Sequence, residues 1–207
     1  IIVLLAIVDS NYNFMYIDVG AKGSISDGGV FCHSNIYDSF ENNQLNIPSP
    51  TVLHPPYAVK VPYMLLGDQA FALSTPLGGT LQSGSVERKF NEIHSRARRP
   101  VENAFGILSS KLRILRRPME LNPDVVKTVV QATVYLHNFL RKRGSSISYT
   151  NSPSFDREED GSFVPGSWRR DEPVESMHPL RSTLFRSAAR LMAMRLHLAN
   201  YLFTYSS

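Results

Sequence analysis

The sequence has one cysteine, Cys32, among its 207 residues. A single thiol excludes an intrachain disulfide and a multi-cysteine zinc site, and it favours a reducing intracellular compartment. No apolar run approaches the roughly 18 residues that a membrane helix needs, so we expect no membrane partner. No P-loop, no paired-histidine metal spacing and no Ser/His/Asp arrangement occurs. The usual sequence signatures of nucleotide hydrolysis, zinc catalysis and serine hydrolysis are therefore missing.

The first residues also lack the features of a leader. The opening run "IIVLLAIV" is only as long as a strand, and no basic residue precedes it, so it is not typical of a signal peptide. No methionine precedes it either, and we expect the chain to be truncated at this end, with an upstream strand of the same domain absent. The composition, 43% hydrophobic and 19% charged residues, is ordinary for a globular protein.

The pattern of apolar and turn-forming residues predicts two strands, a helix and a third strand in the first third of the chain. β-Branched and aromatic residues fill both sides of a polar turn at residues 9–11. The first run is apolar throughout, which predicts burial on both faces. A short helix follows within residues 26–45, with Ser26 or Asp27 as its N-cap. The next strand covers residues 61–68.

Helical patterns dominate the second half. Apolar residues recur at steps of three and four between residues 86 and 116, where Pro100 is expected to divide the stretch into two helices. Another helix is predicted at 123–143, with Asn122 as its N-cap, and a last one at 179–203. The order strand, strand, helix, strand, helices predicts an α/β fold with helices packed on a sheet.

The composition divides the chain into three parts. Residues 1–143 carry the strand and helix patterns and form the predicted domain. Residues 144–176 are rich in Ser, Pro, Asp and Glu and are expected to be a flexible segment. Residues 177–207 contain the C-terminal helix.

A lone histidine lies on one of these helices. His137 falls in the apolar sequence "YLHNFL". A histidine in such a place is more often a hydrogen-bonded core residue than a ligand, so we expect a structural role.

Two acidic residues occupy positions suited to chemistry. Asp68 ends an apolar strand in "LLGDQAF", and ligand sites in open α/β sheets lie at the carboxyl ends of strands. A capping role for a following helix explains Asp68 equally well. Glu102 lies in "RARRPVENAFGIL", where the residues alone favour a first-turn glutamate that suits the helix dipole. A pair with Arg98, four residues earlier, is the alternative if the helix continues through Pro100.

Basic residues concentrate in one part of the chain. Residues 88–117 hold nine of the 22 Lys and Arg residues and two acids, a net charge of roughly +7. Such a run can hold a nucleic acid backbone, and we weigh that interpretation at least equally with a solvated helix face. The nine residues are Arg88, Lys89, Arg96, Arg98, Arg99, Lys111, Arg113, Arg116 and Arg117.

Four sequence motifs, taken in order, resemble the PIF/Harbinger DDE transposase family, and among its members the Harbinger transposase-derived nucleases of animals. The motifs are "IIVLLAIVDSNYNFMYIDVGAKGSISDGGVF", "YMLLGDQAFAL", "FNEIHSRARRPVENAFGILSSKLRIL" and "VYLHNFL". The resemblance runs from residue 1 to about residue 143 and continues weakly through "GSWR" and the last helix. Ser109 and Ala72 stand where family members usually carry a lysine and a proline.

The resemblance implies a DDE endonuclease domain over residues 1–143 with an RNase H-like fold, a mixed sheet flanked by helices, whose N-terminal strand is missing here. The family holds Mg²⁺ or Mn²⁺ with three carboxylates and cleaves DNA phosphodiester bonds. Asp68 matches the second acid and Glu102 the third, both as catalytic residues and as metal ligands. The first acid is expected upstream of residue 1, and Asp27 ranks as an auxiliary metal ligand.

The resemblance also implies partners and a location. DNA is the expected substrate, a separate DNA-binding protein is the expected partner for target recognition, and the nucleus, with the cytoplasm second, is the expected location. Because one acid is absent, we expect a nuclease that is fragmentary or impaired. The alternative function is a domesticated module that binds DNA or protein without catalysis, and a third alternative is the product of a decayed gene. The residues expected to bind DNA are Arg88, Lys89, Arg96, Arg98, Arg99, Lys111 and Arg113.

Overall fold

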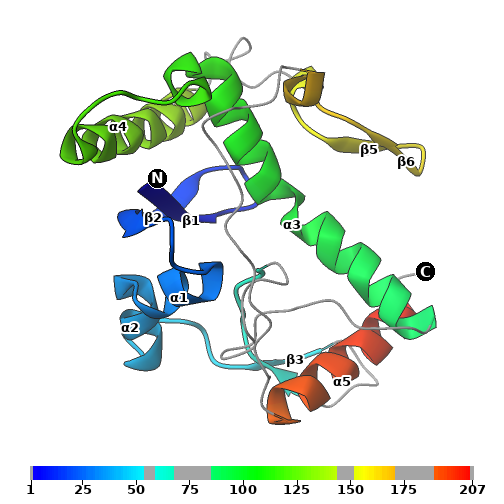
Figure 1. Cartoon of the computed structure of the whole chain (residues 1–207). Coiled ribbons are helices and arrows are strands. Elements are labelled where there is room, and N and C mark those ends of the chain that lie inside the picture. Colours follow the sequence, from blue (N-terminus) through cyan, green and yellow to red (C-terminus); the bar gives the residue numbers. More distant parts are fainter. Residues whose placement is uncertain (1, 54–58, 68–84, 144–151, 171–188, 206–207) are drawn as a thin grey trace. The chain divides into compact units, whose positions relative to one another are not determined.

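The computed structural model describes residues 2–53, 59–67, 85–143, 152–170 and 189–205 (Figure 1). The chain divides into two compact units, Ile1–Ser24 with Arg99–Leu180 and Ile25–Arg98 with Arg181–Ser207. The described strands form three two-stranded antiparallel sheets, which together with the helices is consistent with the predicted α/β fold. The RNase H-like mixed sheet remains a prediction. No helix within these ranges combines the length and the apolarity of a membrane span.

An antiparallel hairpin begins the first unit, as the sequence predicts. β1 (Ile2–Val8) pairs with β2 (Phe14–Lys22). The carboxylate of Asp9 holds the turn between them, because its Oδ1 accepts a hydrogen bond from the backbone N–H of Asn13 at 2.8 Å. Tyr12 takes the left-handed backbone conformation, with φ of 63°, that this tight turn requires.

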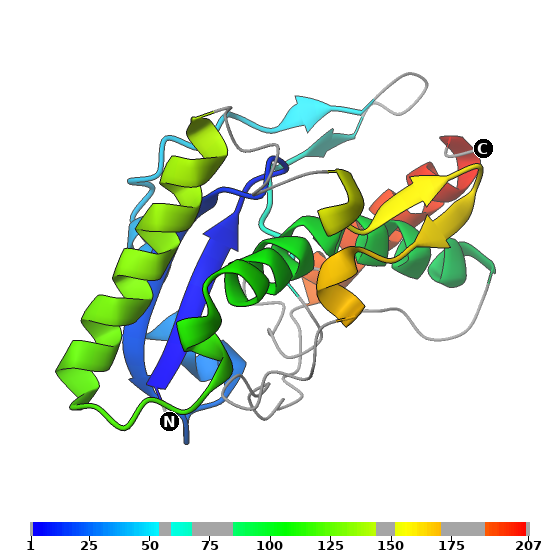
Figure 2. The ribbon, with the colours of Figure 1, turned by 90° about the horizontal axis from the view of Figure 1, so that it is seen from above.

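The core of the first unit lies between the hairpin, α3 (Ser85–Lys111) and α4 (Pro123–Lys142), and Figure 2 shows α4 running alongside the hairpin. The prediction that β1 is buried on both faces is wrong, because Val3 is the only buried residue of the strand and the others are half-buried. Alternate residues of a strand point to one face, and here Leu4, Ala6 and Val8 contact the core. The buried members of the core are Phe14, Ala104, Leu108, Leu115 and Val134.

Hydrogen bonds as well as apolar packing attach α4 to the hairpin. The Asn138 side chain pairs with both backbone groups of Phe14: its Oδ1 accepts from the N–H at 2.9 Å and its Nδ2 donates to the carbonyl at 2.8 Å. His137 is fully buried, with Nε2 2.9 Å from the carbonyl oxygen of Tyr12. Burial lowers the pKa of His137, so the neutral ring donates this hydrogen bond. The predicted structural role of His137 is confirmed.

The two long helices differ in how well the sequence predicts them. α3 passes through Pro100 without interruption, so the predicted division into two helices is wrong. A proline inside a helix removes one N–H donor, and α3, at 27 residues, continues on both sides of it. α3 ends at Lys111, and a 3₁₀ turn, η1 (Arg113–Arg116), follows it. α4 begins and ends as predicted, with Asn122 as its side-chain N-cap.

Residues 152–170 fold, although the composition predicts a flexible segment over 144–176. They form a small hairpin with a 3₁₀ turn on each side. Asp160 and Gly161 make the hairpin turn, and both have positive φ, the conformation that two-residue hairpin loops favour. The elements are η2 (Ser152–Ser154), β5 (Arg157–Glu159), β6 (Ser162–Val164) and η3 (Ser167–Arg170).

In the second unit, the single helix predicted within residues 26–45 is two helices, α1 (Asp27–Cys32) and α2 (Asn35–Glu41). Ser26 caps α1 as predicted. Ser34 separates the two helices, because its hydroxyl donates to the carbonyl of Phe31 at 2.6 Å and also caps the start of α2.

The strand predicted at 61–68 is found only at Val61, and the prediction is wrong for residues 62–67. β4 (Lys60–Val61) pairs with β3 (Thr51–Val52) and ends there, since Pro62 has no N–H to continue the ladder. α5 (Ala189–Tyr205) is the described part of the helix predicted at 179–203. An apolar cavity of about 400 Å³ lies against α3 and α5, and its lining includes Met194 and Leu198 of α5.

Candidate active site

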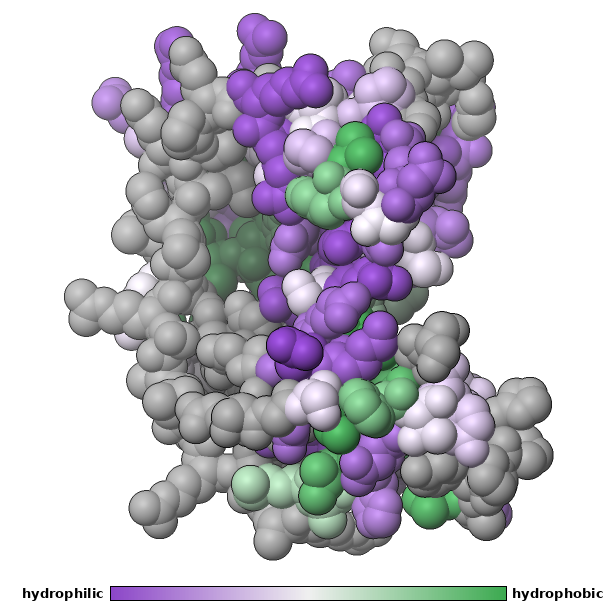
Figure 3. Space-filling model, turned by 90° about the vertical axis from the view of Figure 1, so that its right-hand side faces the viewer, coloured by the Kyte–Doolittle hydropathy of each residue, from purple (hydrophilic) through white to green (hydrophobic). Residues whose placement is uncertain are grey.

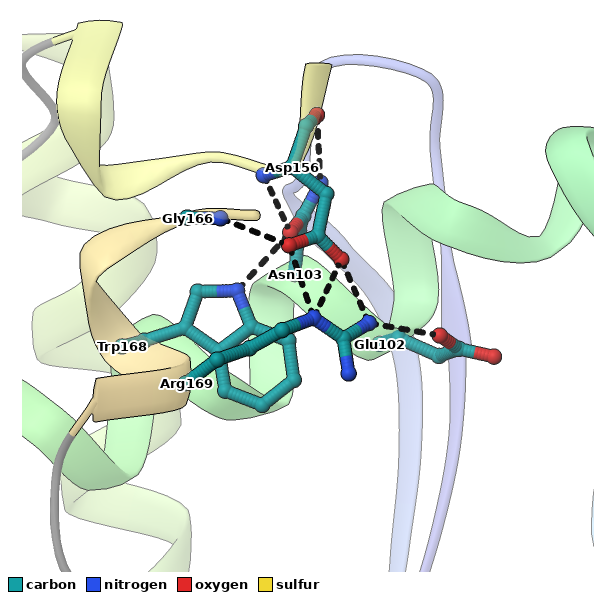
Figure 4. Close-up of polar contacts among 6 residues, drawn as sticks. All are labelled: Glu102, Asn103, Asp156, Gly166, Trp168 and Arg169. Carbon is teal, nitrogen blue, oxygen red and sulfur yellow. Dashed lines mark hydrogen bonds and ion pairs between the residues drawn. The ribbon is translucent and has the colours of Figure 1, made fainter. Parts of the chain in front are cut away.

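Glu102 lies on α3 in the first unit, with 40% of its side chain exposed. Its Oε2 is 3.3 Å from Nη2 of Arg169, which lies on η3 (Figure 4). The two residues are 67 positions apart in the sequence. The carboxylate that the sequence predicts as catalytic therefore faces a guanidinium from the segment that the sequence predicts to be flexible.

A buried carboxylate fixes the guanidinium of Arg169. The side chain of Asp156 is fully buried, and Nε of Arg169 donates to its Oδ1 at 2.8 Å while Nη2 donates to its Oδ2 at 2.6 Å. The backbone N–H of Gly166 donates to the same Oδ1 at 2.8 Å. Two parallel N–H···O bonds are the strongest arrangement for this pair of side chains, so Arg169 is held in one orientation beside Glu102.

The pKa values of the pair follow from these contacts. Burial alone raises the pKa of Asp156, but the hydrogen bonds from Arg169 and Gly166 outweigh it and bring the pKa below its ordinary value. The hydrogen bond to Asp156 raises the pKa of Arg169 against the opposing effect of its own partial burial. Both groups are therefore charged at neutral pH.

Asn103, the neighbour of Glu102, attaches the segment 152–170 to α3. Its Oδ1 accepts from the backbone N–H of Asp156 and from Nε1 of Trp168, both at 2.9 Å, and its Nδ2 donates to the carbonyl of Asp156 at 3.4 Å. Gly106 makes room for the indole, because a Cβ at this position would lie 2.2 Å from Cδ2 of Trp168. Trp168 in turn lies under Arg169, with 4.3 Å between the guanidinium carbon and the ring centroid.

The side chains of the other two predicted acids, Asp68 and Asp27, lie outside the described part of the chain. Asp68 lies outside the described residues, so its predicted approach to Glu102 stays a prediction. Asp27 begins α1 in the second unit, and its side chain lies outside the described residues as well. Within the described ranges no group of three His, Cys, Asp or Glu residues is placed to hold a metal ion. Among the described residues, Glu102 supplies one carboxylate oxygen donor of the kind that Mg²⁺ and Mn²⁺ prefer, and the cation beside it is the guanidinium of Arg169.

The predicted DNA-binding residues fall in both units, and several have acidic partners. Arg96 lies 3.2 Å from Glu92, and Lys89 lies 4.0 Å from the same residue. Arg99 lies 3.5 Å from Glu158. On the face that Figure 3 draws, the coloured residues are mostly hydrophilic, with hydrophobic residues in smaller areas among them. Arg88, Lys89, Arg96 and Arg98 belong to the second unit, and Arg99, Lys111 and Arg113 to the first.

No motif of the sequence indicates a role for Asp156, Arg169 or Asn103. The Ser-, Pro- and acid-rich composition around Asp156 suggested a flexible segment, and polar residues that pair with one another are not distinguished by composition from solvated ones. A local signal was present, because "GSWR" contains the one tryptophan of the chain. A large aromatic residue next to an arginine is unusual in a segment that does not fold.

The family of the protein follows from the sequence match. A family model described as DDE superfamily endonuclease matches residues 1–138, two thirds of the chain. The chain belongs to this family, whose endonuclease domain indicates a transposase-derived nuclease with DNA as substrate and generally with divalent metal ions. No curated protein matches the chain, and no solved structure matches it either. The matched region includes positions 68 and 102 and ends before Asp156 and Arg169.

Proposed function

We propose that this protein is a nuclease of the PIF/Harbinger branch, with an RNase H-like core, that hydrolyses DNA phosphodiester bonds with Mg²⁺ or Mn²⁺. The observation that carries the proposal is the family match, which spans both candidate acids. Asp68 and Glu102 act as catalytic residues and metal ligands, and Asp27 is an auxiliary ligand. The exposure of Glu102 supports this role, because a buried carboxylate could not reach a phosphodiester.

DNA binding in this proposal depends on charge. Lys and Arg side chains displace the counterions of the phosphate backbone, which makes affinity fall steeply with salt. A separate DNA-binding protein supplies target recognition, and the protein acts in the nucleus, with the cytoplasm as a second location. The residues assigned to DNA binding are Arg88, Lys89, Arg96, Arg98, Arg99, Lys111 and Arg113.

The test is nicking of supercoiled plasmid in Mn²⁺ by a parent protein that includes the expected upstream strand with its acid, and by the Asp68→Asn and Glu102→Gln variants of that protein. We expect each substitution to lower the nicking rate at least 100-fold, because carboxamides are poor ligands for hard cations. Glu120→Gln is the matched control, since Glu120 is an exposed glutamate away from the site, and it should nick at the parental rate. Equal rates in all four proteins would refute the assigned roles.

A second function, binding of DNA or protein without catalysis, is favoured by one observation. Within the described ranges Glu102 pairs with Arg169, and no three-residue metal-binding group is found there. A binding module should hold DNA equally well in EDTA and Mn²⁺. Charge reversal at Arg96, Arg98 and Arg99 should then abolish binding, whereas Asp68→Asn should have no effect.

A further inference from the structure

The contact between Arg169 and Glu102 joins the proposed catalytic residue to a part of the chain outside the family match. The match ends at residue 138, whereas Arg169 lies on η3. The matched region therefore does not include this guanidinium.

Three contacts restrict where the Arg169 side chain can lie. Asp156 binds it through Nε and Nη2 from a fully buried position. The indole of Trp168 lies against its guanidinium carbon at 4.3 Å. Asn103 fixes both Asp156 and Trp168 to α3, one residue from Glu102. A guanidinium held in this way can orient a neighbouring carboxylate, because it keeps its own position when the carboxylate moves.

We propose that Arg169 is a positioning residue for Glu102: it holds the carboxylate in one orientation at the surface of α3. This inference rests on the proposed function of Glu102 as a catalytic residue. Asp156 and Trp168 act through Arg169 and touch no substrate. Residues 152–170 are thus part of the nuclease site and supply an element that the matched region lacks.

The variants are chosen so that the buried carboxylate is never left alone. In Arg169→Gln combined with Asp156→Asn, both charges are removed together, and a neutral pair of similar size remains. Arg169→Lys keeps the charge but loses the planar fork, so one ammonium cannot hold Asp156 through two bonds and still orient Glu102. Arg170→Gln is the matched control, an exposed arginine on the same 3₁₀ turn.

The first readout is nicking of a short DNA duplex in Mn²⁺ by the full chain, with kcat and KM measured separately. We expect kcat to fall 10- to 100-fold in the double variant and less in Arg169→Lys, as for other residues that support catalytic ligands. KM should stay within about twofold of the parent, because a positioning residue does not bind DNA. Arg170→Gln should match the parent in kcat.

The second readout needs no activity. In metal-free protein labelled with ¹³C at the glutamate side-chain carboxyl, the Glu102 resonance is identified by its loss in Glu102→Gln. It should shift in Arg169→Lys and in the double variant, and not in Arg170→Gln. If the double variant does not fold, Arg169→Lys alone decides both readouts.

Each result supports or overturns the inference. An unshifted resonance, an unchanged kcat, or a raised KM with kcat unchanged overturns it and leaves the proposed function intact, provided that Glu102→Gln still abolishes nicking. If the parent does not nick DNA, or if Glu102→Gln nicks as well as the parent, the proposed function fails and the inference fails with it.

Discussion

Two asparagines in the first unit make the same contact in different surroundings. Asn138 on α4 pairs with the backbone N–H and carbonyl of Phe14, and Asn103 on α3 pairs in the same way with Asp156. In each case the side-chain amide of a helix residue makes the two hydrogen bonds that a peptide group of a neighbouring strand would make. The first contact attaches β2 to α4, and the second attaches the segment 152–170 to α3.

The difference lies in what surrounds each asparagine. Asn138 adjoins the apolar core, with Phe14 against the rings of Phe105 and His137. Asn103 adjoins the ion pair between the buried carboxylate of Asp156 and the partly exposed Arg169. Apolar burial stabilises without a defined partner, whereas a buried charge stabilises only while its partner remains. The attachment beside Glu102 should therefore be the more sensitive of the two to single substitutions.

The largest effect should come from Arg169→Ala, which leaves the Asp156 carboxylate buried without its cation. We expect a loss of about 3 kcal/mol in the free energy of unfolding, at the lower end for buried pairs because Arg169 is partly exposed. Urea unfolding measures it. Arg170→Ala should cost less than about 0.5 kcal/mol, and equal losses in the two variants would contradict a special role for the ion pair.

The two asparagines can be compared directly by Asn103→Ala and Asn138→Ala. Each leaves two backbone groups without their partner, which should cost about 2 kcal/mol. Asn103→Ala should cost more, because Nε1 of Trp168 also loses its acceptor. Amide hydrogen exchange at Asp156 and Phe14 shows which attachment has opened. A larger loss of stability in Asn138→Ala than in Asn103→Ala would contradict the expectation that the Asn103 attachment is the more sensitive one.

Gly106→Ala tests the close approach of Trp168 to α3. The added methyl group meets the indole, so we expect a cost of about 1 to 2 kcal/mol. In a Trp168→Ala background the same substitution should instead stabilise by up to about 1 kcal/mol, because alanine favours the helix over glycine. Urea unfolding of the four proteins gives a double-mutant cycle. If Gly106→Ala lowers the free energy of unfolding in both backgrounds, the clash with Trp168 is excluded.

The smallest effect should be the pH dependence of stability caused by His137, which lies next to Asn138 and also attaches α4 to the hairpin. Burial lowers the pKa of His137 in the folded protein, with the charge of Arg141 acting in the same direction. The unfolded chain then binds the proton more readily, so stability is present above the ordinary histidine pKa of 6.5 and is lost as pH falls below it. Between pH 7.5 and 5.5 we expect a loss of about 1 kcal/mol. His137→Gln, which keeps a donor, should remove this dependence.

The sequence predicts the elements that Asn138 joins, β2 and α4, better than the segment that Asn103 joins to α3. Runs of β-branched and aromatic residues on both sides of a polar turn define the β1–β2 hairpin, and an asparagine followed by proline defines the start of α4. Local patterns of this kind determine local structure, so both elements are found where they are expected. The prediction that Pro100 divides the helix is wrong because a long helix can lose one hydrogen bond and continue.

The candidate site depends on contacts that no local pattern contains. Glu102 is predictable from its motif, but its partner lies 67 residues away on a segment whose composition resembles that of disordered chains. Asp156 is distinguished from a solvated acid only by its burial against Arg169, and burial is a property of the folded chain. The separation of α1 from α2 at Ser34 is likewise decided by one side-chain hydrogen bond.

The Asn138 contact also has a consequence for association between molecules. Exposed strand edges offer unpaired N–H and carbonyl groups to which other chains can add a strand. At Phe14 both groups are already bound by Asn138, so an incoming strand would find neither a donor nor an acceptor there. One helix side chain thus protects the start of β2 from edge-to-edge aggregation.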